Sequence, residues 1–260
     1  MSDPVFQAQH RLATSFGYQE VRAEDKAKLV RGVFDSVAAR YDLMNDLMSG
    51  GVHRLWKAAM IDWLAPRPGM VVVDVAGGTG DIAFRVQDRA ARRAGPPPRV
   101  VVCDINPAML EVGRDRAIDD NRTGGLEWLC ADAEALPLPE RMADAYTIAF
   151  GIRNVTRIER ALAEARRVLK PGGRFLCLEF SAVRLAGLRE LYDLYSFTAL
   201  PWLGRQVAGD PEAYRYLAES IRRFPDQATF AAMIEAAGLG RVRWHDLSGG
   251  IAAMHSAWRI

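Results

Sequence analysis

The stretch Val73-Asp74-Val75-Ala76-Gly77-Gly78-Thr79-Gly80-Asp81 joins an apolar run, which begins at residue 71, to a segment with helical spacing. A continuous apolar run bounded by glycines is typical of a parallel strand that is buried on both faces. Glycines let the backbone turn tightly, and they let a ligand approach it without meeting a side chain. Ligands of open parallel sheets bind beyond the carboxyl ends of the strands. This loop is therefore the first candidate for a binding site.

The alternation of apolar runs and helical segments continues along the chain. Four more runs have the length and composition of buried strands: 100–104, 126–130, 145–150 and 174–180. Asn106 followed by Pro107 predicts a helix start, because Asn caps helices and Pro suits the first helical position. Two last runs, near 241–247 and 251–259, are expected to pair antiparallel at an edge. We therefore predict an α/β fold with a doubly wound, mostly parallel, seven-stranded sheet.

Two segments lie outside this alternation. Apolar residues recur at helical spacing over about 24–64, interrupted at 49–51, and predict helices there. We expect residues 1–65 to form a helical cover at the N-terminus. A second segment, about 183–224, is rich in aromatic residues and is expected to be a helical lid insertion over the strand ends. The whole chain, 1–260, is expected to be one domain.

Composition and charge narrow the function classes. The formal net charge of the 260 residues is +2, too small to indicate nucleic-acid binding, so no nucleic-acid partner is expected. No run of about 18 apolar residues is present that would span a bilayer. The start Met1-Ser2-Asp3-Pro4 lacks the basic and apolar regions of a signal peptide. We therefore expect a cytoplasmic protein.

Cysteine and histidine usage points the same way. Cys103, Cys130 and Cys177 all fall inside predicted strands, which suggests buried free thiols in a reducing compartment. The four histidines are scattered, and no Cys/His cluster has zinc spacing. No metal site is expected.

The glycine loop alone does not identify its ligand. Gly78, Gly80 and Ala83 satisfy a loose dinucleotide pattern, but Asp74 and Asp81 flank the loop. Carboxylates repel a pyrophosphate and suit the positive amino-acid end of S-adenosylmethionine (SAM). We therefore predict SAM as the cofactor and assign Asp74, Gly78 and Gly80 to its site. The alternative is that the glycines form an ordinary turn.

Two later strand ends carry further candidates. Asp104 ends the second strand, where a carboxylate can accept hydrogen bonds from both hydroxyls of a ribose. Asp132 and Ala133 follow the third strand, where Asp132 could accept from an adenine amino group and Ala133 could donate its backbone N–H. Taken singly, Asp104 could be a neighbour of a helix cap, and Asp132 could be an ordinary solvated loop residue.

Several blocks of sequence closely resemble the ubiquinone/menaquinone biosynthesis C-methyltransferases of the UbiE type. The resemblance runs from about residue 14 to the C-terminus. It is much more specific than the glycine loop, which would place the chain only among SAM-dependent methyltransferases. The blocks that carry the resemblance are Thr14–Tyr18, Phe34–Asp42, Met44–Ser49, His53–Lys57, Phe150–Val155 and Tyr214–Ile221.

The resemblance implies a class I methyltransferase fold, which is Rossmann-like, and a reaction. That reaction is the SAM-dependent methylation of a ring carbon in a polyprenylated quinol, 2-polyprenyl-6-methoxy-1,4-benzoquinol or demethylmenaquinol. The family positions that match Thr79, Asp104, Asp132 and Ala133 are SAM contacts. The family often has a serine just before the Phe-Gly pair, where this chain has Ala149. A hydroxyl contact is therefore not expected there.

The catalytic candidates come from the blocks that carry the resemblance. We predict that Arg153 and Asn154 lie beyond the fourth strand and face the acceptor ring. Arg153 would hold a phenolate oxygen, and Asn154 would orient a hydroxyl or a water. Tyr41, on the N-terminal helix, would cover the ring or move a proton through water. The alternatives are a surface arginine and a core tyrosine.

The polyprenyl quinol is the expected partner, and its lipid tail suggests transient contact with a membrane surface at its inner face. A quinone-biosynthesis complex or a homodimer is also considered. Three rival functions stay open. A nicotinamide-dependent oxidoreductase of the short-chain type would have its glycine motif near the N-terminus and a Tyr-x-x-x-Lys motif, which is absent. A non-catalytic SAM-binding subunit and a methyltransferase for another phenolic or lipid acceptor would share the glycine loop.

Overall fold

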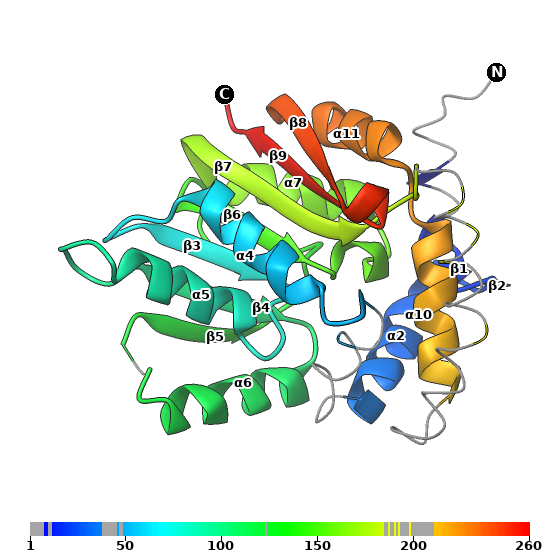
Figure 1. Ribbon diagram of the computed structural model, residues 1–260, viewed down its shortest axis with the longest axis horizontal. Coiled ribbons are helices and arrows are strands. Elements are labelled where there is room, and N and C mark those ends of the chain that lie inside the picture. Colours follow the sequence, from blue (N-terminus) through cyan, green and yellow to red (C-terminus); the bar gives the residue numbers. More distant parts are fainter. Residues whose placement is uncertain are drawn as a thin grey trace.

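A seven-stranded sheet lies at the centre of the molecule (Figure 1). The computed structural model describes residues 8–9, 12–37, 46, 49–122, 124–184, 187, 190, 192, 198 and 211–260. The strands of the sheet are β3 (Val71–Val75), β4 (Arg99–Asp104), β5 (Leu126–Cys130), β6 (Ala143–Ala149), β7 (Leu169–Phe180), β8 (Gly240–Leu247) and β9 (Ala252–Trp258). Their order is β5-β4-β3-β6-β7-β9-β8.

Strands β3 to β7 pair in parallel, whereas β9 is antiparallel to both of its neighbours, β7 and β8. This arrangement confirms the predicted doubly wound, mostly parallel sheet and the antiparallel pair at its edge. Asn106 also caps its helix as predicted. Its side-chain oxygen accepts from the backbone N–H groups of Ala108 and Met109, at 2.9 and 3.2 Å.

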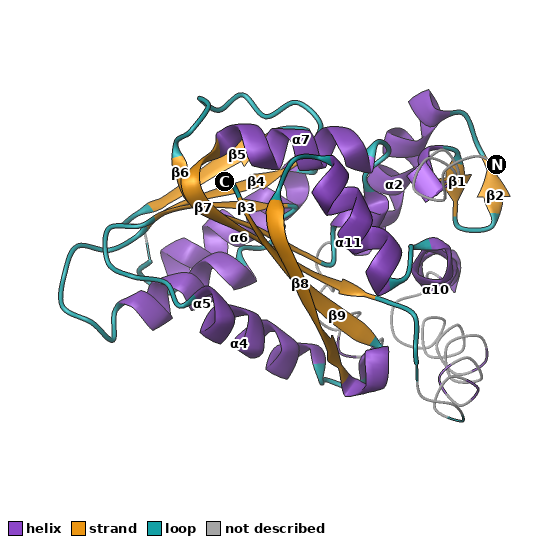
Figure 2. Cartoon of the chain, turned by 90° about the horizontal axis from the view of Figure 1, so that it is seen from above, coloured by secondary structure: helices purple, strands orange, loops and turns teal. Residues whose placement is uncertain are grey.

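Helices cover both faces of the sheet (Figure 2). The helices α4 (His53–Leu64), α5 (Asp81–Ala90) and α6 (Pro107–Asp119) pack on one face, and α7 (Ile158–Val168) and α11 (Gln227–Ala236) pack on the other. Successive side chains of a strand point to opposite faces. In β3, Val72 therefore joins the first core and Val73 the second. This explains why the strands read as unbroken apolar runs rather than as alternating ones.

A separate group of elements, here called the cap, lies beside the carboxyl ends of the parallel strands (Figure 1). It consists of the hairpin strands β1 (Ser15–Phe16) and β2 (Gln19–Glu20) with the helices α2 (Ala23–Val37) and α10 (Pro211–Arg223). Helix α10 contacts α2 and β1.

The hairpin is fastened to α10 by two contacts. Phe16 stacks on Tyr216 with ring centroids 4.3 Å apart, and the Tyr18 backbone N–H donates to Glu219 Oε2 at 2.9 Å. Gly17 turns the hairpin at a φ of +58°, and a Cβ there would lie 2.3 Å from Glu219 Oε2. A glycine is therefore needed between the two contacts.

A buried lysine fastens α2 to the rest of the molecule. Lys26 is 1% exposed, and its Nζ donates to the carbonyl oxygens of Leu12 and Val155, at 2.8 and 3.2 Å. Burial lowers the pKa of Lys26 to about 8, although Glu134 opposes the shift. The donor serves two carbonyls that lie far apart in sequence, so it joins the N-terminal segment, α2 and the turn after β6.

Several expectations need correction or stay open. Cys103 and Cys177 are buried as predicted, but Cys130 is exposed, because β5 is an edge strand of the sheet. Helices α2 and α4 confirm the helical prediction over 24–37 and 53–64, whereas the hairpin was not predicted. A helical lid insertion was expected over 183–224. Of this range, the structure describes residues 183–184, four isolated positions and 211–224, which include α10, and the rest of the expected insertion lies outside the described residues. Among the described helices, none has the length and apolarity to cross a membrane.

Two helical glycines offer a matched test of the packing around the glycine loop. A Cβ on Gly113 of α6 would lie 2.5 Å from the Trp128 ring and 3.0 Å from the backbone carbon of Thr79, whereas a Cβ on Gly32 of α2 would meet nothing within 4 Å. We expect Gly113→Ala to lower the free energy of unfolding by about 1–3 kcal/mol through overpacking. Gly32→Ala should raise it by roughly 0.5–1 kcal/mol through helix propensity. Urea unfolding of both variants measures this, and equal effects would contradict the packing argument.

Candidate active site

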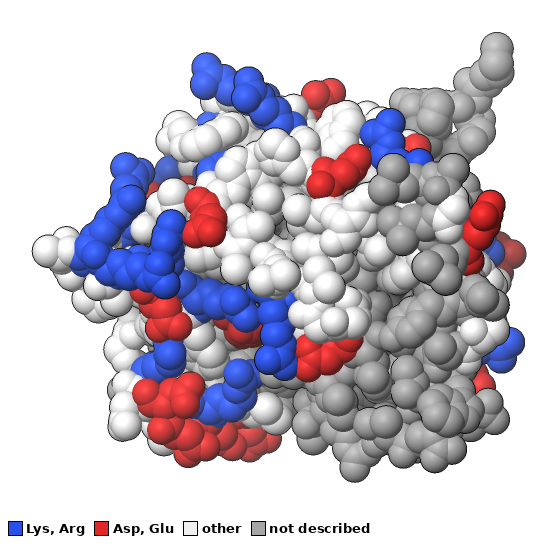
Figure 3. All heavy atoms as spheres, viewed as in Figure 1, with Lys and Arg blue, Asp and Glu red and all other residues white. Residues whose placement is uncertain are grey.

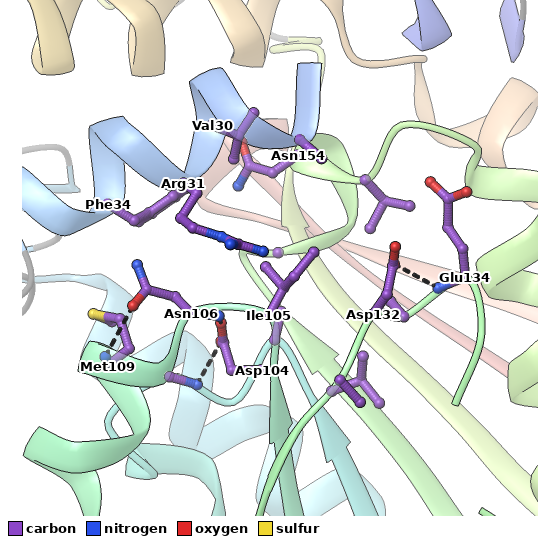
Figure 4. A pocket seen from close by; sticks show the side chains of 18 of the residues that line it. Val30, Arg31, Phe34, Asp104, Ile105, Asn106, Met109, Asp132, Glu134 and Asn154 are labelled. Atoms are coloured by element: carbon purple, nitrogen blue, oxygen red, sulfur yellow. Dashed lines mark hydrogen bonds between the residues drawn. The ribbon is translucent and has the colours of Figure 1, made fainter. Parts of the chain in front are cut away.

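A cavity opens where the carboxyl ends of the parallel strands meet the cap (Figure 4). It encloses about 820 Å³, including the part that is open to solvent. Its lining comes from five places: the loop after β3, the loop after β4, the segment after β5, the turn after β6 and one side of α2.

The floor of the cavity is a close approach of two loops. Ala76, after β3, and Phe150, after β6, adopt φ values of +50° and +58°, which side chains other than glycine rarely do. Both residues line the cavity. A Cβ on the neighbouring Gly151 would lie 2.3 Å from the Ala76 Cβ. Strained backbone of this kind persists only where the surrounding structure enforces it, and it clusters at functional sites.

Asp104 lines the cavity at the end of β4. Its Oδ2 accepts from the Gly78 backbone N–H and its Oδ1 from the Asn106 backbone N–H, both at 2.9 Å. Burial raises the pKa of Asp104 to about 6, against the effect of these backbone donors. Each carboxylate oxygen has more than one lone pair, so the group still has acceptor capacity toward the cavity. The structure therefore places Asp104 where the sequence predicted it.

Asp132 and Ala133 lie across the cavity from the glycine loop. Asp132 is exposed, and its Oδ1 accepts from the Glu134 backbone N–H at 2.9 Å. Ile105 stands between Asp104 and Asp132 and offers an apolar surface (Figure 4). Sequence reasoning missed Ile105, although its position directly after Asp104 could have revealed it.

Three other predicted cofactor residues, in the strand end and the loop, do not line the cavity. Asp74 is buried, its Oδ1 accepts from the Thr147 hydroxyl at 2.7 Å, and burial raises its pKa to about 7. Thr79 is buried, and its hydroxyl accepts from Arg116 at 3.0 Å. Gly80 precedes α5 at a φ of +81°. Of the predicted set, Gly78, Asp104, Asp132 and Ala133 line the cavity, so direct contacts by the other three stay a prediction.

Asp81, also expected to favour a positive ligand, is already paired. Its two oxygens accept from Lys57 Nζ at 2.7 Å and from Arg85 Nε at 2.9 Å. Burial alone would raise the pKa of Asp81, but these two cations hold it below its ordinary value. The carboxylate therefore anchors α5 to α4 and does not face the cavity.

Arg153 was predicted to face the acceptor ring, and the structure pairs its side chain with a buried glutamate. Arg153 and Glu179 are each 2% exposed as side chains, and Nη1 of Arg153 lies 2.6 Å from Glu179 Oε1. The same nitrogen donates to the Phe150 carbonyl oxygen. Burial raises the pKa of Glu179, and Arg153 opposes the shift. Because Arg153 does not line the cavity, its predicted contact with a phenolate stays untested and the geometry favours a supporting role.

Asn154 does line the cavity, at the end of the short helix η2 (Ile152–Asn154). Its amide nitrogen points into the cavity, and its oxygen points toward the cap (Figure 4). Ala149, where the family often has serine, ends β6 and packs against the core. Tyr41, the third predicted catalytic residue, lies outside the described residues.

Helix α2, part of the helical cover expected at the N-terminus, contributes a wall of the cavity, although its lining residues were not predicted individually. Ala27, Val30 and Phe34 are apolar lining residues, and Arg31 lies between them. Among the described lining residues, Arg31 is the one cation, and it faces three acids: Asp104, Asp132 and Glu134. No helical pattern could have shown which side of α2 turns toward the strand ends. In the part of the chain that the structure describes, no group of three or more His, Cys, Asp or Glu could hold a metal ion.

Several solved structures similar to this one carry the name of a methyltransferase. A SAM-dependent methyltransferase from Aquifex aeolicus matches with a TM-score of 0.57 at 16% identity, over 78% of this chain and 89% of that one. A phosphoethanolamine N-methyltransferase from Haemonchus contortus, in complex with SAM, matches with a TM-score of 0.57 at 11% identity, over 78% of this chain and 52% of that one. At these identities, the likeness establishes the class I methyltransferase fold.

Sequence relatives are far closer. A ubiquinone/menaquinone biosynthesis C-methyltransferase UbiE of Paracoccus denitrificans is 59% identical over 247 residues, which cover 95% of this chain and 97% of the relative. A protein of the same name from Rhodopseudomonas palustris is 57% identical, with the same coverage of both chains. The model of the ubiE/COQ5 methyltransferase family matches residues 20–259, and the chain therefore belongs to that family.

Proposed function

We propose that the chain methylates a ring carbon of a polyprenylated quinol, either 2-polyprenyl-6-methoxy-1,4-benzoquinol or demethylmenaquinol, with SAM as the donor. The observation that carries the proposal is a near-full-length match to C-methyltransferases of ubiquinone and menaquinone biosynthesis, at 59% identity. The cavity supports it, because it combines an acidic side with an apolar wall at the carboxyl ends of the strands.

The lining residues suit SAM better than a dinucleotide. Asp104 would accept the ribose hydroxyls, and Ile105 would pack against the adenine. Asp132 and the Ala133 backbone N–H would bind the edge of the adenine, as the sequence predicts. Asp104 and Asp132 favour a ligand with positive charge and oppose a pyrophosphate, whereas Glu134, the third lining acid, is paired with Arg157 at 2.8 Å. When bound, SAM supplies an electrophilic methyl group on a sulfonium.

The chain's own part in the reaction is to place the acceptor ring and to handle its oxygen. Val30, Phe34 and Val155 would hold the ring against the methyl donor. Positioning of this kind can be worth roughly 10⁵–10⁸ M in effective concentration. The Asn154 amide nitrogen would donate to a ring oxygen. When that oxygen is deprotonated, the ring carbon that accepts the methyl group becomes more nucleophilic. Tyr41 stays a proposed cover of the ring or participant in proton transfer.

The lipid tail of the acceptor implies contact with a membrane surface, and the cap offers a candidate for it. Tyr18 and Leu29 of the cap are 49% and 40% exposed, which is unusual for large apolar side chains. Arg223 lies over the Tyr18 ring at 5.5 Å and adds positive charge. Elsewhere, Lys and Arg gather toward the left of Figure 3, away from the cap, and are mixed with acids. We propose a cytoplasmic protein that meets the inner face of the membrane through the cap, alone, as a homodimer or in a quinone-biosynthesis complex.

Methyl transfer can be tested directly. Purified protein with labelled SAM and each reduced acceptor, carrying a short prenyl tail, should place label on a ring carbon. The ratio of the two products assigns the preferred ring. An oxidised quinone of the same tail length is the control and should not react, because its ring is electron-poor. Binding of SAM without transfer to either quinol would instead favour a non-catalytic subunit or another phenolic or lipid acceptor.

The Asp104 carboxylate predicts a pH dependence of cofactor binding. Because burial raises its pKa to about 6, the group gains a proton below that pH and loses acceptor capacity for the ribose. The dissociation constant of S-adenosylhomocysteine, measured by calorimetry, should therefore rise as pH falls through 6, by up to about tenfold per pH unit.

Variants of Asp104 and Asp132 show which carboxylate causes the pH dependence. Asp104→Asn should weaken binding by about 10–100-fold and remove the dependence near pH 6. Asp132→Asn, which also removes a lining carboxylate, should keep it. A dependence that survives in Asp104→Asn would point to another buried acid, such as Asp74, whose pKa is about 7.

Because Arg153 and Glu179 form a buried pair, a variant of Arg153 is expected to change stability as well as activity. Arg153→Ala leaves a buried, unpaired carboxylate and should lower the free energy of unfolding by about 3–5 kcal/mol. The double variant Arg153→Met/Glu179→Gln removes both charges and should recover most of that loss. Thermal unfolding checks the two values. Loss of activity in the single variant could come from its lower stability. Turnover of the stable double variant therefore decides whether the guanidinium itself is needed.

A further inference from the structure

The side chain of Asn154 is held from the cap. The Tyr216 hydroxyl, on α10, donates to Asn154 Oδ1 at 3.0 Å. Tyr216 is 4% exposed, and Phe16 of the hairpin stacks on its ring. Burial raises the pKa of Tyr216 well above its ordinary value, so the hydroxyl keeps its proton and stays a donor at neutral pH.

A second contact from the cap reaches the next residue of the same turn. Lys26 Nζ, on α2, donates to the Val155 carbonyl oxygen at 3.2 Å. Helix α10 therefore contacts the side chain of Asn154, and α2 contacts the backbone of the next residue, Val155. Asn154 and Val155 both line the cavity, whereas Tyr216 and Lys26 do not.

In the structure, the oxygen of the Asn154 amide is the end that meets Tyr216. An asparagine amide has one oxygen, which only accepts, and one NH₂ group, which only donates. Since Oδ1 accepts from Tyr216, the NH₂ group is the end turned into the cavity (Figure 4). A donor at this place stabilises negative charge on an oxygen of the ring, whereas an oxygen there would repel it.

We propose that Tyr216 is a positioning residue for methyl transfer: its hydroxyl fixes the Asn154 amide so that the nitrogen donates to a ring oxygen of the bound acceptor. This rests on the proposed function. Tyr216 touches neither acceptor nor cofactor, and it acts only through Asn154. The cap thereby takes part in the chemistry, because α10 must be seated for the donor to point the right way.

Kinetics with the labelled-SAM assay test the use of the contact. Tyr216→Phe removes only the hydroxyl and should lower kcat by about 10–100-fold, since a misplaced group near the reacting atoms has effects of that size. The dissociation constant of S-adenosylhomocysteine should change less than about twofold. The matched control is Tyr214→Phe, a fully buried tyrosine of the same helix that does not line the cavity, and it should keep the wild-type kcat.

A double variant separates positioning from general support of the fold. If Tyr216 acts through Asn154, then Asn154→Ala and Tyr216→Phe/Asn154→Ala should have the same kcat within about twofold. A further fall in the double variant would overturn the proposal, because the hydroxyl would then act by another route. An unchanged kcat in Tyr216→Phe would overturn it as well.

The contact itself has a readout that needs no turnover. In a ¹⁵N-labelled sample, the Asn154 side-chain amide is the NH₂ pair that disappears in Asn154→Ala. This pair should shift in Tyr216→Phe and stay in place in Tyr214→Phe. An unshifted pair overturns the proposal. A shifted pair with no methylation of either quinol by wild type supports the contact and overturns the proposed function, and with it the role of Tyr216 in the reaction.

Discussion

The buried carboxylate of Asp104 joins three parts of the molecule that the cavity needs in register. It ends β4, accepts from the glycine loop through Gly78, and accepts from the residue that caps α6, Asn106. Without these two donors, a carboxylate in this place would be far more costly to ionise. With them, one group sets the geometry of the loop and also keeps acceptor capacity toward the cavity. The fold and the site therefore depend on the same interaction.

The sheet could be predicted because its physics is local. A parallel strand between two helical layers must be apolar on both sides, so Val71–Val75 reads as a strand from its composition alone. The hairpin at 15–20 could not be predicted in the same way. Its two strands have two residues each, and they are held by contacts with Tyr216 and Glu219, about 200 positions away. Nothing in the sequence around the hairpin reveals those partners.

The sequence predicted which residues lie near the cavity, but it did not predict which way their side chains point. The end of a strand identified Asp104 and Asp132 as residues near the cavity, because parallel strands bring their carboxyl ends together, whereas Asn154 came from the family resemblance. These two lines of reasoning placed Arg153 and Asp74 correctly along the chain. They could not show that the two side chains turn inward, since their partners, Glu179 and Thr147, come from neighbouring strands. The direction of a side chain follows from its partners, and those are set by tertiary structure.

The seating of the hairpin on α10 has a consequence for synthesis of the chain. The ribosome makes Tyr18 about 200 residues before Glu219, the acceptor of its backbone N–H. Throughout that interval, the hairpin and the cavity side of α2 have no α10 to pack against. Domains begin to fold from the N-terminus during translation, and exposed apolar surface at that stage is prone to aggregation. The hairpin and α2 therefore leave the ribosome first but complete their packing only after α10 is made. The N-terminal end is thus the part of the nascent chain that depends longest on chaperones.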